Sequence, residues 1–334
     1  MKAFRHSRLV AALALVALTT AATAQAQQPV NLTIGSFGQG SGWYVYSVNL
    51  AEVLRTVLPA GSKIDTPPIA GSVGNPRLVA EGKADLAFGM ANVSNWARKG
   101  TISFKEPLEN LRALAGGWDK YYLVVVAAGE KSGPGMDKFL QKDVPNTRVI
   151  LLPRGGVGPV GGMQMLNMLN ASEDDIKKRG GNFEFGSFDA VKTRFSSRNA
   201  DLFIHVANPG HPAITELAQN NAVTFLQPPP QVLAEMNKQF GWTTVVMPKG
   251  TFPKQDQELR LAGTSTTLFA STRMSDDLAY TIVKTICEKT DRLRAAHKAL
   301  AGFDCANDAW KEEANGLPLH PGAERYYRER AWLK

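Results

Sequence analysis

The chain has 334 residues, of which 44% are hydrophobic, 20% charged and 8% aromatic. This composition is that of an ordinary globular protein, and it excludes disordered, collagen-like and low-complexity classes. The formal net charge is +8, and no run of basic residues is longer than three. The chain is long enough for about two domains. A net positive charge of this size, spread over two domains, does not require nucleic acid as a partner, and we expect none.

The first 26 residues are typical of a secretory signal peptide. Lys2, Arg5 and Arg8 precede an apolar run at 9–18, and Ala24-Gln25-Ala26 fits a cleavage site of small residues. Cleavage two residues earlier, at Ala22-Thr23-Ala24, is the alternative. The apolar run is half the ~20 residues that a membrane-spanning helix needs. We therefore expect a protein that is exported to the periplasm and cleaved near Ala26.

Cys287 and Cys305 are the two cysteines of the chain. An oxidising compartment permits a disulfide between them, which would close one modest loop and stabilise the fold by ~3 kcal/mol in the chain-entropy model. Two buried free thiols are the alternative. A Cys-x-x-Cys pair is absent from the sequence, so a zinc or thiol redox site of that type is not expected.

Short β-rich runs alternate with helical patterns along the chain. Strand character is found at 30–34, 63–66, 84–88, 111–115, 122–128, 147–152, 182–185, 200–206, 222–226 and 261–268. Helical spacing is found at 46–58, 75–82 and 278–286, and Ser172 with Asp175 resembles a capping box. This alternation is typical of an α/β protein in which mostly parallel sheets are flanked by helices.

Two glycine-rich loops each lead from a predicted strand into a predicted helix. The loop at 35–42 lacks the lysine of a P-loop and the spacing of a dinucleotide fingerprint. The loop at 153–158 carries Arg154, whose guanidinium can pair with a carboxylate. Because a helix start exposes free N–H groups to anions, two such loops indicate an anion-binding cleft between two lobes. A flexible turn and a solvated arginine are the alternatives.

Motifs of catalysis and metal binding are sparse. A Gly-x-Ser-x-Gly turn is absent, and His205, His211, His297 and His320 occur without a His-Glu-x-x-His pattern or a nearby pair of cysteines. We expect no catalytic residue, no metal and no cofactor, and thus a protein that binds its ligand without converting it. A secreted enzyme that uses His205 as a general base is the alternative.

A series of short sequence blocks extends over nearly the whole expected mature chain. The blocks are Leu32-Thr33-Ile34-Gly35, Gly42-Trp43-Tyr44, Gly71-Ser72-Val73-Gly74-Asn75-Pro76-Arg77-Leu78, and those at 82–88, 208–214, 248–253 and 318–327. In this order they resemble the TAXI family of TRAP-transporter solute-binding proteins, and the last block is the most specific. The resemblance implies a two-lobed periplasmic receptor of the type II-like class, which closes on a small solute and delivers it to a sodium-driven membrane permease.

The same resemblance implies which residues bind the solute. In the first lobe these are Ser41, Gly42, Trp43, Tyr44, Ser72, Asn75 and Asn92. In the second lobe they are Gly155, Gly156, Gly158, His205, Asn208 and Trp242, to which the residue chemistry adds Arg154. Gly156 and Gly158 stand where the family usually has serine and threonine. Two hydroxyl donors are therefore missing, which predicts a solute that is smaller or less polar than glutamate, or held through water.

We expect lobe 1 to comprise 27–120 and 246–334 and lobe 2 to comprise 121–245, with a ligand cleft between them. Tyr121 and Tyr122 then lie near the first crossing between lobes. The expected ligand is a small organic anion, either an amino acid or another carboxylate. The expected partners are the membrane permease subunits of a TRAP transporter. We expect the receptor itself to be a monomer. A subunit that presents ligand to a membrane sensor is a further alternative, because the sequence does not identify the membrane partner.

Overall fold

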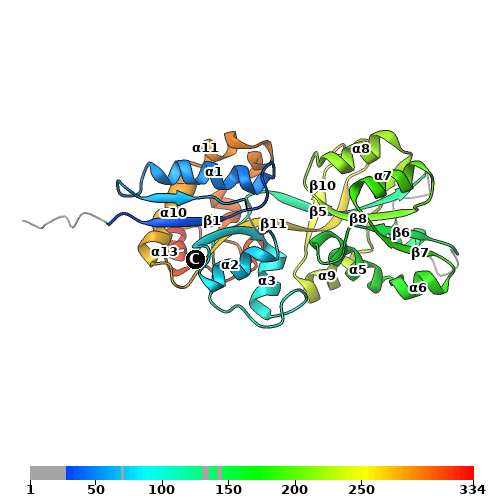
Figure 1. The fold of residues 1–334 in the computed structure, drawn as a ribbon, viewed down its shortest axis with the longest axis horizontal. Coiled ribbons are helices and arrows are strands. Elements are labelled where there is room, and N and C mark those ends of the chain that lie inside the picture. Colours follow the sequence, from blue (N-terminus) through cyan, green and yellow to red (C-terminus); the bar gives the residue numbers. More distant parts are fainter. Residues whose placement is uncertain (1–27, 69–70, 130–134, 141–144) are drawn as a thin grey trace, which may run out of the picture.

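The structure is a computed structural model that describes residues 28–68, 71–129, 135–140 and 145–334. The expected signal peptide at 1–26 lies outside the described residues. Two α/β lobes lie side by side, and two strands, β5 (Lys120–Ala128) and β11 (Leu259–Ser271), extend between them (Figure 1). Helices flank the central sheet, which confirms the predicted two-lobed α/β class.

The first lobe combines the N-terminal part of the chain with its C-terminal part. Its strands are β1 (Asn31–Gly35), β2 (Lys63–Asp65), β3 (Leu86–Met90) and β4 (Leu111–Ala115). Its helices are α1 (Gly42–Arg55), α2 (Gly74–Glu81), α3 (Ala91–Lys99), α10 (Asp276–Glu288), α11 (Thr290–Ala296), η1 (Lys298–Gly302), η2 (Cys305–Ala309), α12 (Glu312–Asn315) and α13 (Pro321–Glu329). The lobe is therefore assembled from segments far apart in the sequence.

The second lobe is formed by the middle of the chain. Its strands are β6 (Arg148–Leu151), β7 (Asn182–Phe185), β8 (Leu202–Ala207), β9 (Val223–Phe225) and β10 (Thr243–Met247). Its helices are α4 (Met136–Phe139), α5 (Val157–Met168), α6 (Glu173–Lys178), α7 (Phe188–Ser196), α8 (Pro212–Asn220) and α9 (Pro230–Phe240). Both lobes thus have the same strand-and-helix construction.

Hydrogen bonding follows the order β2-β1-β3-β11-β5-β8-β6-β7 through both lobes. Parallel pairs join β1 to β2 and β3, and join β6 to β7 and β8. The pairs that involve β5 or β11 are antiparallel. The expectation of mostly parallel pairing is therefore wrong, because the two crossing strands run opposite to the strands on either side of them.

The long strand β11 carries the second passage between the lobes. Its first part pairs with β10, with Leu259 opposite Met247, whereas from Thr266 onward it pairs with β3. Leu259, Leu261 and Phe252 belong to the hydrophobic cluster of the second lobe. This packing favours a second passage of the chain between the lobes within β11, after the expected boundary at residue 246. The residue limits of the two lobes stay a prediction.

Local sequence signals explain several helix ends. Ser41 caps α1 by accepting a hydrogen bond from the Tyr44 backbone N–H. Gly82 ends α2 with a φ of 76°, in the left-handed region that favours glycine. The predicted capping box of Ser172 and Asp175 is present at the start of α6. These caps fix where the helices begin relative to the loops that precede them.

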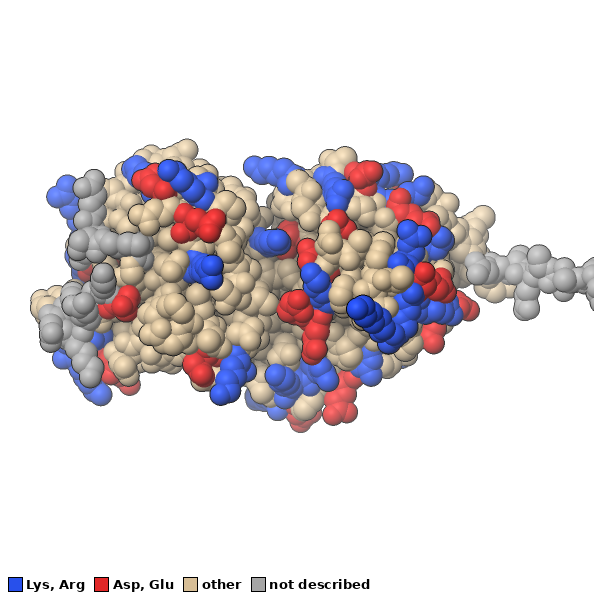
Figure 2. Space-filling view, turned by 180° about the vertical axis from the view of Figure 1, so that it is seen from behind, with Lys and Arg blue, Asp and Glu red and all other residues tan. Residues whose placement is uncertain are grey.

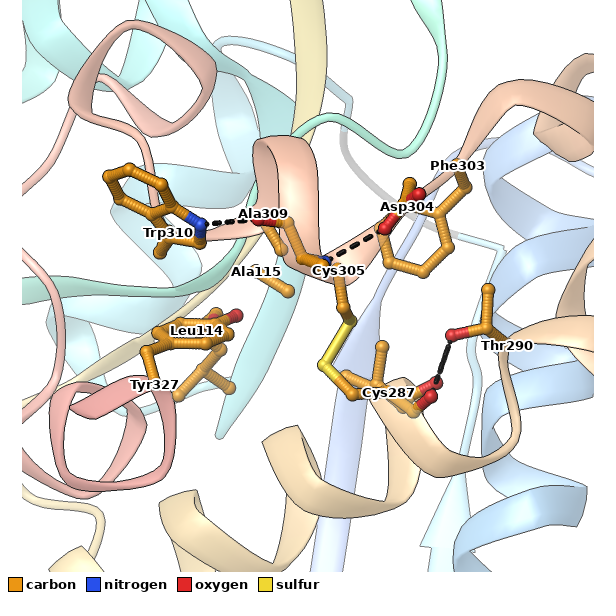
Figure 3. The surroundings of a disulfide bond; sticks show 12 residues. Leu114, Ala115, Cys287, Thr290, Phe303, Asp304, Cys305, Ala309, Trp310 and Tyr327 are labelled. Carbon is orange, nitrogen blue, oxygen red and sulfur yellow. Dashed lines mark hydrogen bonds between the residues drawn. A yellow bond between two sulfur atoms is a disulfide. The ribbon is translucent and has the colours of Figure 1, made fainter. Parts of the chain in front are cut away.

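Cys287 and Cys305 are joined by a disulfide bond, with their Cα atoms 5.5 Å apart (Figure 3). The bond connects the end of α10 to η2 and encloses α11 and η1. Thr290 donates a hydrogen bond to the carbonyl of Cys287 on one side of the bridge. The bridge therefore anchors both ends of the segment that contains α11 and η1. Within the described ranges, every helix is too short or too polar to cross a membrane.

Candidate functional site

A cavity of about 480 Å³ lies between the two lobes. The first lobe contributes the loops before α1 and α2, the end of β3 and the junction of α11 with η1. The second lobe contributes the end of β8 and the loop between β8 and α8. The view from behind shows a constriction between the lobes, with basic and acidic side chains interspersed over both (Figure 2).

The cavity brings together six of the residues that the sequence placed at the ligand. They are Ser41, Gly42, Trp43, Ser72, His205 and Asn208. The loops that carry them follow the carboxyl ends of β1, β2 and β8. In open α/β sheets this is where ligands bind, because the helix starts and their connecting loops gather there. Segments far apart in the sequence are thus assembled into one site.

The wall next to α1 is held rigid by buried hydrogen bonds. The Trp43 indole N–H donates to Thr266 Oγ1 at 2.9 Å, so the ring presents its apolar surface. Tyr46 donates to Asp119 Oδ2 at 2.9 Å, behind the same wall. Burial is the main cause that raises the pKa of Asp119 to about 6, against the opposing hydrogen bonds of Thr266 and Tyr46. The crossing strands and α1 are therefore connected directly beside the cavity.

On the second lobe the wall consists of two histidine rings. The ring centroids of His205 and His211 are 5.6 Å apart, and Phe188 packs against both. The Nδ1 atoms of both histidines are buried without a hydrogen-bond partner among the described residues. Burial lowers the pKa of His205 to about 3 and also lowers the pKa of His211. Both rings are therefore neutral at pH 7.

His297 and Lys298 line the cavity from the C-terminal part of the chain, and the sequence analysis did not place them there. A Cβ atom on Gly210 would lie 3.5 Å from Lys298 Nζ, so the ammonium group approaches the loop of the opposite lobe. The residues around His297 and Lys298 form no motif that predicts their place at the cavity. Both residues do lie between the two bridged cysteines, which is the one feature of the sequence that could have drawn attention to them.

Phe37, Met90, Tyr121 and His211 also line the cavity and were not among the predicted ligand-binding residues. Tyr121 was expected near the hinge or rim, and it lies on β5 at the crossing. Phe37 is 51% exposed, which is unusual for a phenyl ring and leaves one apolar face at the opening. These residues make the cavity richer in rings than the sequence pattern indicated.

Three predicted residues of the first lobe do not line this cavity. The fully buried amide of Asn75 donates to the carbonyls of Ser36 and Phe88, each at 2.7 Å, and so holds the loops around the cavity in place. Tyr44 lies on α1 and is not part of the lining. Asn92 lies in the first turn of α3, and its side-chain amide is buried with no hydrogen-bond partner among the described residues.

Arg154 lies outside the cavity lining. It forms an ion pair with Glu173, its guanidinium carbon lies 4.0 Å from the centroid of the Phe185 ring, and its side chain is 55% exposed. Trp242 is fully buried and donates to Gln164 Oε1 at 2.9 Å. Both side chains are thus engaged in contacts within the second lobe.

The second glycine loop packs behind the histidine wall. Gly155 has a φ of 92°, and Gly156 is the N-cap of α5. A Cβ atom on Gly158 would lie only 2.4 Å from His205 Nδ1, which is closer than real side chains come. The His205 ring therefore fills the space that a serine or threonine at position 158 would occupy. The described residues contain no cluster of three metal-ligating side chains.

Two lobes, two crossing strands and a cavity lined from both sides define the fold of two-lobed solute-binding proteins. The chain belongs to the NMT1-like family, whose model matches residues 34–330.

Many solved structures are similar to this chain, among them three at low sequence identity. XAC2383 from Xanthomonas citri, bound to ATP, has a TM-score of 0.52 at 11% identity, covering 90% of this chain and 94% of that one. MatC from Rhodopseudomonas palustris, with bound malate, has a TM-score of 0.50 at 14% identity, covering 91% and 98%. A TctC solute-binding protein from Polaromonas, without ligand, has a TM-score of 0.51 at 13% identity, covering 80% and 86%. These similarities establish the fold.

Proposed function

We propose that the protein is a periplasmic solute-binding receptor of the TAXI type, serving a TRAP-type secondary transporter. It captures a small solute that bears a carboxylate in the cavity between its lobes and delivers it to the membrane permease. The sequence blocks that resemble the TAXI family support the subfamily. The fold supports the receptor class, and MatC, which shares that fold, has bound malate in its structure.

The observation that carries the proposal is the charge of the cavity. Among the described residues that line it, Lys298 is the one cation, and none is an aspartate or glutamate. The start of the 14-residue helix α1 adds backbone N–H groups at Gly42 and Trp43. A carboxylate in this place is stabilised by the ammonium group and by the helix start together.

The state of His205 argues against the enzyme alternative. A general base works best when its pKa is near the operating pH. Burial lowers the pKa of His205 to about 3, so its imidazole is a weak base at neutral pH. Its Nδ1 faces Gly158 instead of the open cavity. A binding role as part of the apolar wall accounts for both features.

A thermal-shift screen of the purified protein tests this function. The panel contains carboxylates, amino acids, sulfonates, neutral sugars and polyamines, because a ligand that binds the folded state raises its stability by RT ln(1 + [L]/Kd). We expect stabilisation by at least one carboxylate, and recovery of that compound unchanged by mass spectrometry after incubation. Stabilisation by neutral sugars or polyamines alone would contradict the carboxylate. Conversion of the solute would contradict the receptor function.

A further inference from the structure

Lys298 supplies the positive charge in the lining of the cavity. Among the described residues, no carboxylate lies within ion-pairing distance of Lys298 Nζ. The ammonium group nevertheless lies between the lobes, beside Gly210 of the loop that precedes α8. Lys298 is exposed, and its ammonium group supplies one positive charge to a ligand at the cavity.

The rest of the lining offers rings without charge. Trp43 is 5% exposed and its indole N–H is already bonded to Thr266, so the ring is fixed. Tyr121 lies at the crossing, and burial raises the pKa of its hydroxyl, which keeps it neutral. His205 and His211 form the opposite wall, with buried Nδ1 atoms. Uncharged rings therefore line the cavity from both lobes, with the His205 and His211 rings at 72° to each other, and a ring-bearing solute can pack against them face-on or edge-on.

A partner for an ammonium group is missing from the lining. The nearby carboxyl of Asp119 is buried behind the wall, and its Oδ2 accepts the hydrogen bond of Tyr46. Burial is the main cause that raises the pKa of this carboxyl to about 6, and Asp119 belongs to the lining of a neighbouring cavity of about 400 Å³ instead of this one. An α-amino group would therefore lose its hydration without gaining an ion pair. A second carboxylate would also lose its hydration without gaining an ion pair, because Lys298 is the one cationic side chain among the described lining residues.

We propose that the solute is a planar, ring-bearing monocarboxylate without an amino group. Its carboxylate is bound by Lys298, and its ring lies between Trp43 on the first lobe and the His205–His211 pair on the second. A cavity of about 480 Å³ accommodates a compound of this size. This inference rests on the proposed receptor function and narrows its ligand from carboxylates in general to one kind of monoanion.

Calorimetric titration with compounds of matched skeleton tests the inference. The ring acids are benzoate, phenylacetate and 3-phenylpropanoate. L-Phenylalanine adds an ammonium group to the last, phenylsuccinate adds a carboxylate, and 3-phenylpropanamide removes the charge. We expect the best ring acid to bind at least ~10-fold more tightly than each of these three, the change expected for one charged hydrogen bond. Glutamate and malate are included as ring-free anions and are expected to bind more weakly still.

Variants then locate the charge. Lys298→Ala should weaken the ring acid at least ~10-fold while leaving the amide unchanged, and Lys298→Arg should retain most of the affinity. Lys249→Ala removes an exposed lysine away from the cavity and is the matched control. Arg154→Ala tests the cation expected from the sequence, and a loss there with none in Lys298→Ala would overturn the assignment.

The outcomes separate this inference from the proposed function. If phenylalanine, a dicarboxylate or a ring-free acid binds more tightly than every ring acid, the inference is wrong and the receptor function stands. If no compound in either panel binds, both are contradicted. Tight binding of ring acids that is unaffected in Lys298→Ala would contradict the geometry proposed here.

Discussion

At the first turn of α5, the His205 ring occupies the space next to Gly158 where a larger residue would place its side chain. A Cβ atom on Gly158 would lie 2.4 Å from His205 Nδ1 and 3.2 Å from the Val206 backbone nitrogen. The glycine thus lets the histidine ring pack against the helix, with its other side toward the cavity. A serine or threonine side chain at position 158 would need the space that the His205 ring occupies.

We expect Gly158→Ser to destabilise the protein by ~1–3 kcal/mol, because the new side chain displaces the ring. Solute binding should weaken as well, since His205 lines the cavity. Removing the ring in the double variant Gly158→Ser/His205→Ala should recover part of the lost stability, which a double-mutant cycle from urea unfolding measures. Gly38→Ser, with no atom within 4 Å of its Cβ, is the control. Additive effects of the two substitutions would contradict the shared space.

Asp119 predicts how stability depends on pH. Its pKa is raised from 3.8 to about 6 in the folded protein, mainly by burial. Because the folded state then binds the proton more tightly than the unfolded chain, this group favours folding at low pH, and the benefit is lost as pH rises from about 4 through 6. Asp119→Asn removes the charge and retains an acceptor for the Tyr46 hydroxyl.

The Asp119→Asn variant should therefore be more stable than the wild type at pH 8, by an amount of the order of 1–3 kcal/mol. The gain should vanish near pH 4, where the Asp119 carboxyl of the folded wild-type protein is protonated and therefore uncharged, as the asparagine is. Urea unfolding at pH 4, 6 and 8 gives the difference directly. A stability difference that is the same at all three values would show that the carboxyl does not titrate in this range.

The segment between the two cysteines is the element that connects stability to binding. The disulfide joins α10 to η2, and His297 and Lys298 lie on the segment that it closes (Figure 3). Cys305 is buried, and Phe303 next to it stacks on Trp118 with ring centroids 4.8 Å apart. The bridge therefore fixes one end of η1 against the core of the first lobe, and Lys298 begins η1.

We expect the double variant Cys287→Ser/Cys305→Ser to lose ~3 kcal/mol of stability, as the loss of a loop closure of this length predicts. Below its lower melting temperature it should also bind the carboxylate solute more weakly, because the segment that carries Lys298 is less restrained. Calorimetry at a temperature where both proteins are folded measures this second effect. Lower stability with unchanged affinity would mean that the bridge supports the fold without positioning Lys298.

Local patterns predicted the elements well where a signal lies within a few residues. The cap at Ser41, the glycine that ends α2 and the capping box at Ser172 are of this kind. The strand β10 was not predicted, although Thr243 to Met247 is rich in β-branched residues and lies between Gly241 and Pro248. Its pairing with β11 depends on a contact that no short window contains.

The site was predicted in part for the same reason. The glycines around Ser41, Gly42 and Trp43 predicted a loop at the ligand, and these residues line the cavity. The chemistry of Arg154 suggested an anion, but Glu173, which pairs with it, lies on a different element and could not be foreseen as its neighbour. Lys298 reaches the cavity only through the three-dimensional placement of η1.

At the scale of the molecule, contacts other than the crossing strands also join the lobes. Trp96 on α3 donates its indole N–H to the carbonyl of Phe240, at the end of α9, at 2.7 Å. Trp96 also packs edge-to-face on Trp242, with ring centroids 6.4 Å apart. These contacts lie outside the lining of the cavity. These contacts connect the two lobes at a second place besides β5 and β11.

Closure around a solute requires that the solute bind the closed form better than the open form. The cavity meets this condition in its construction, because Trp43 and Lys298 belong to one lobe and His205 and His211 to the other. A solute that contacts all four residues stabilises the closed arrangement. The solute should then change the shape of the whole molecule as well as its stability.

Small-angle X-ray scattering with and without the carboxylate solute tests the central claim most directly. We predict that the radius of gyration of the wild-type protein falls at saturating solute. At a solute concentration about twice the wild-type Kd, Lys298→Ala should show a smaller fall than the wild type, because a variant that binds ~10-fold more weakly is mostly unoccupied there. An unchanged radius of gyration in the wild type, at a concentration where calorimetry shows the site to be saturated, would contradict a receptor that closes on its solute between two lobes.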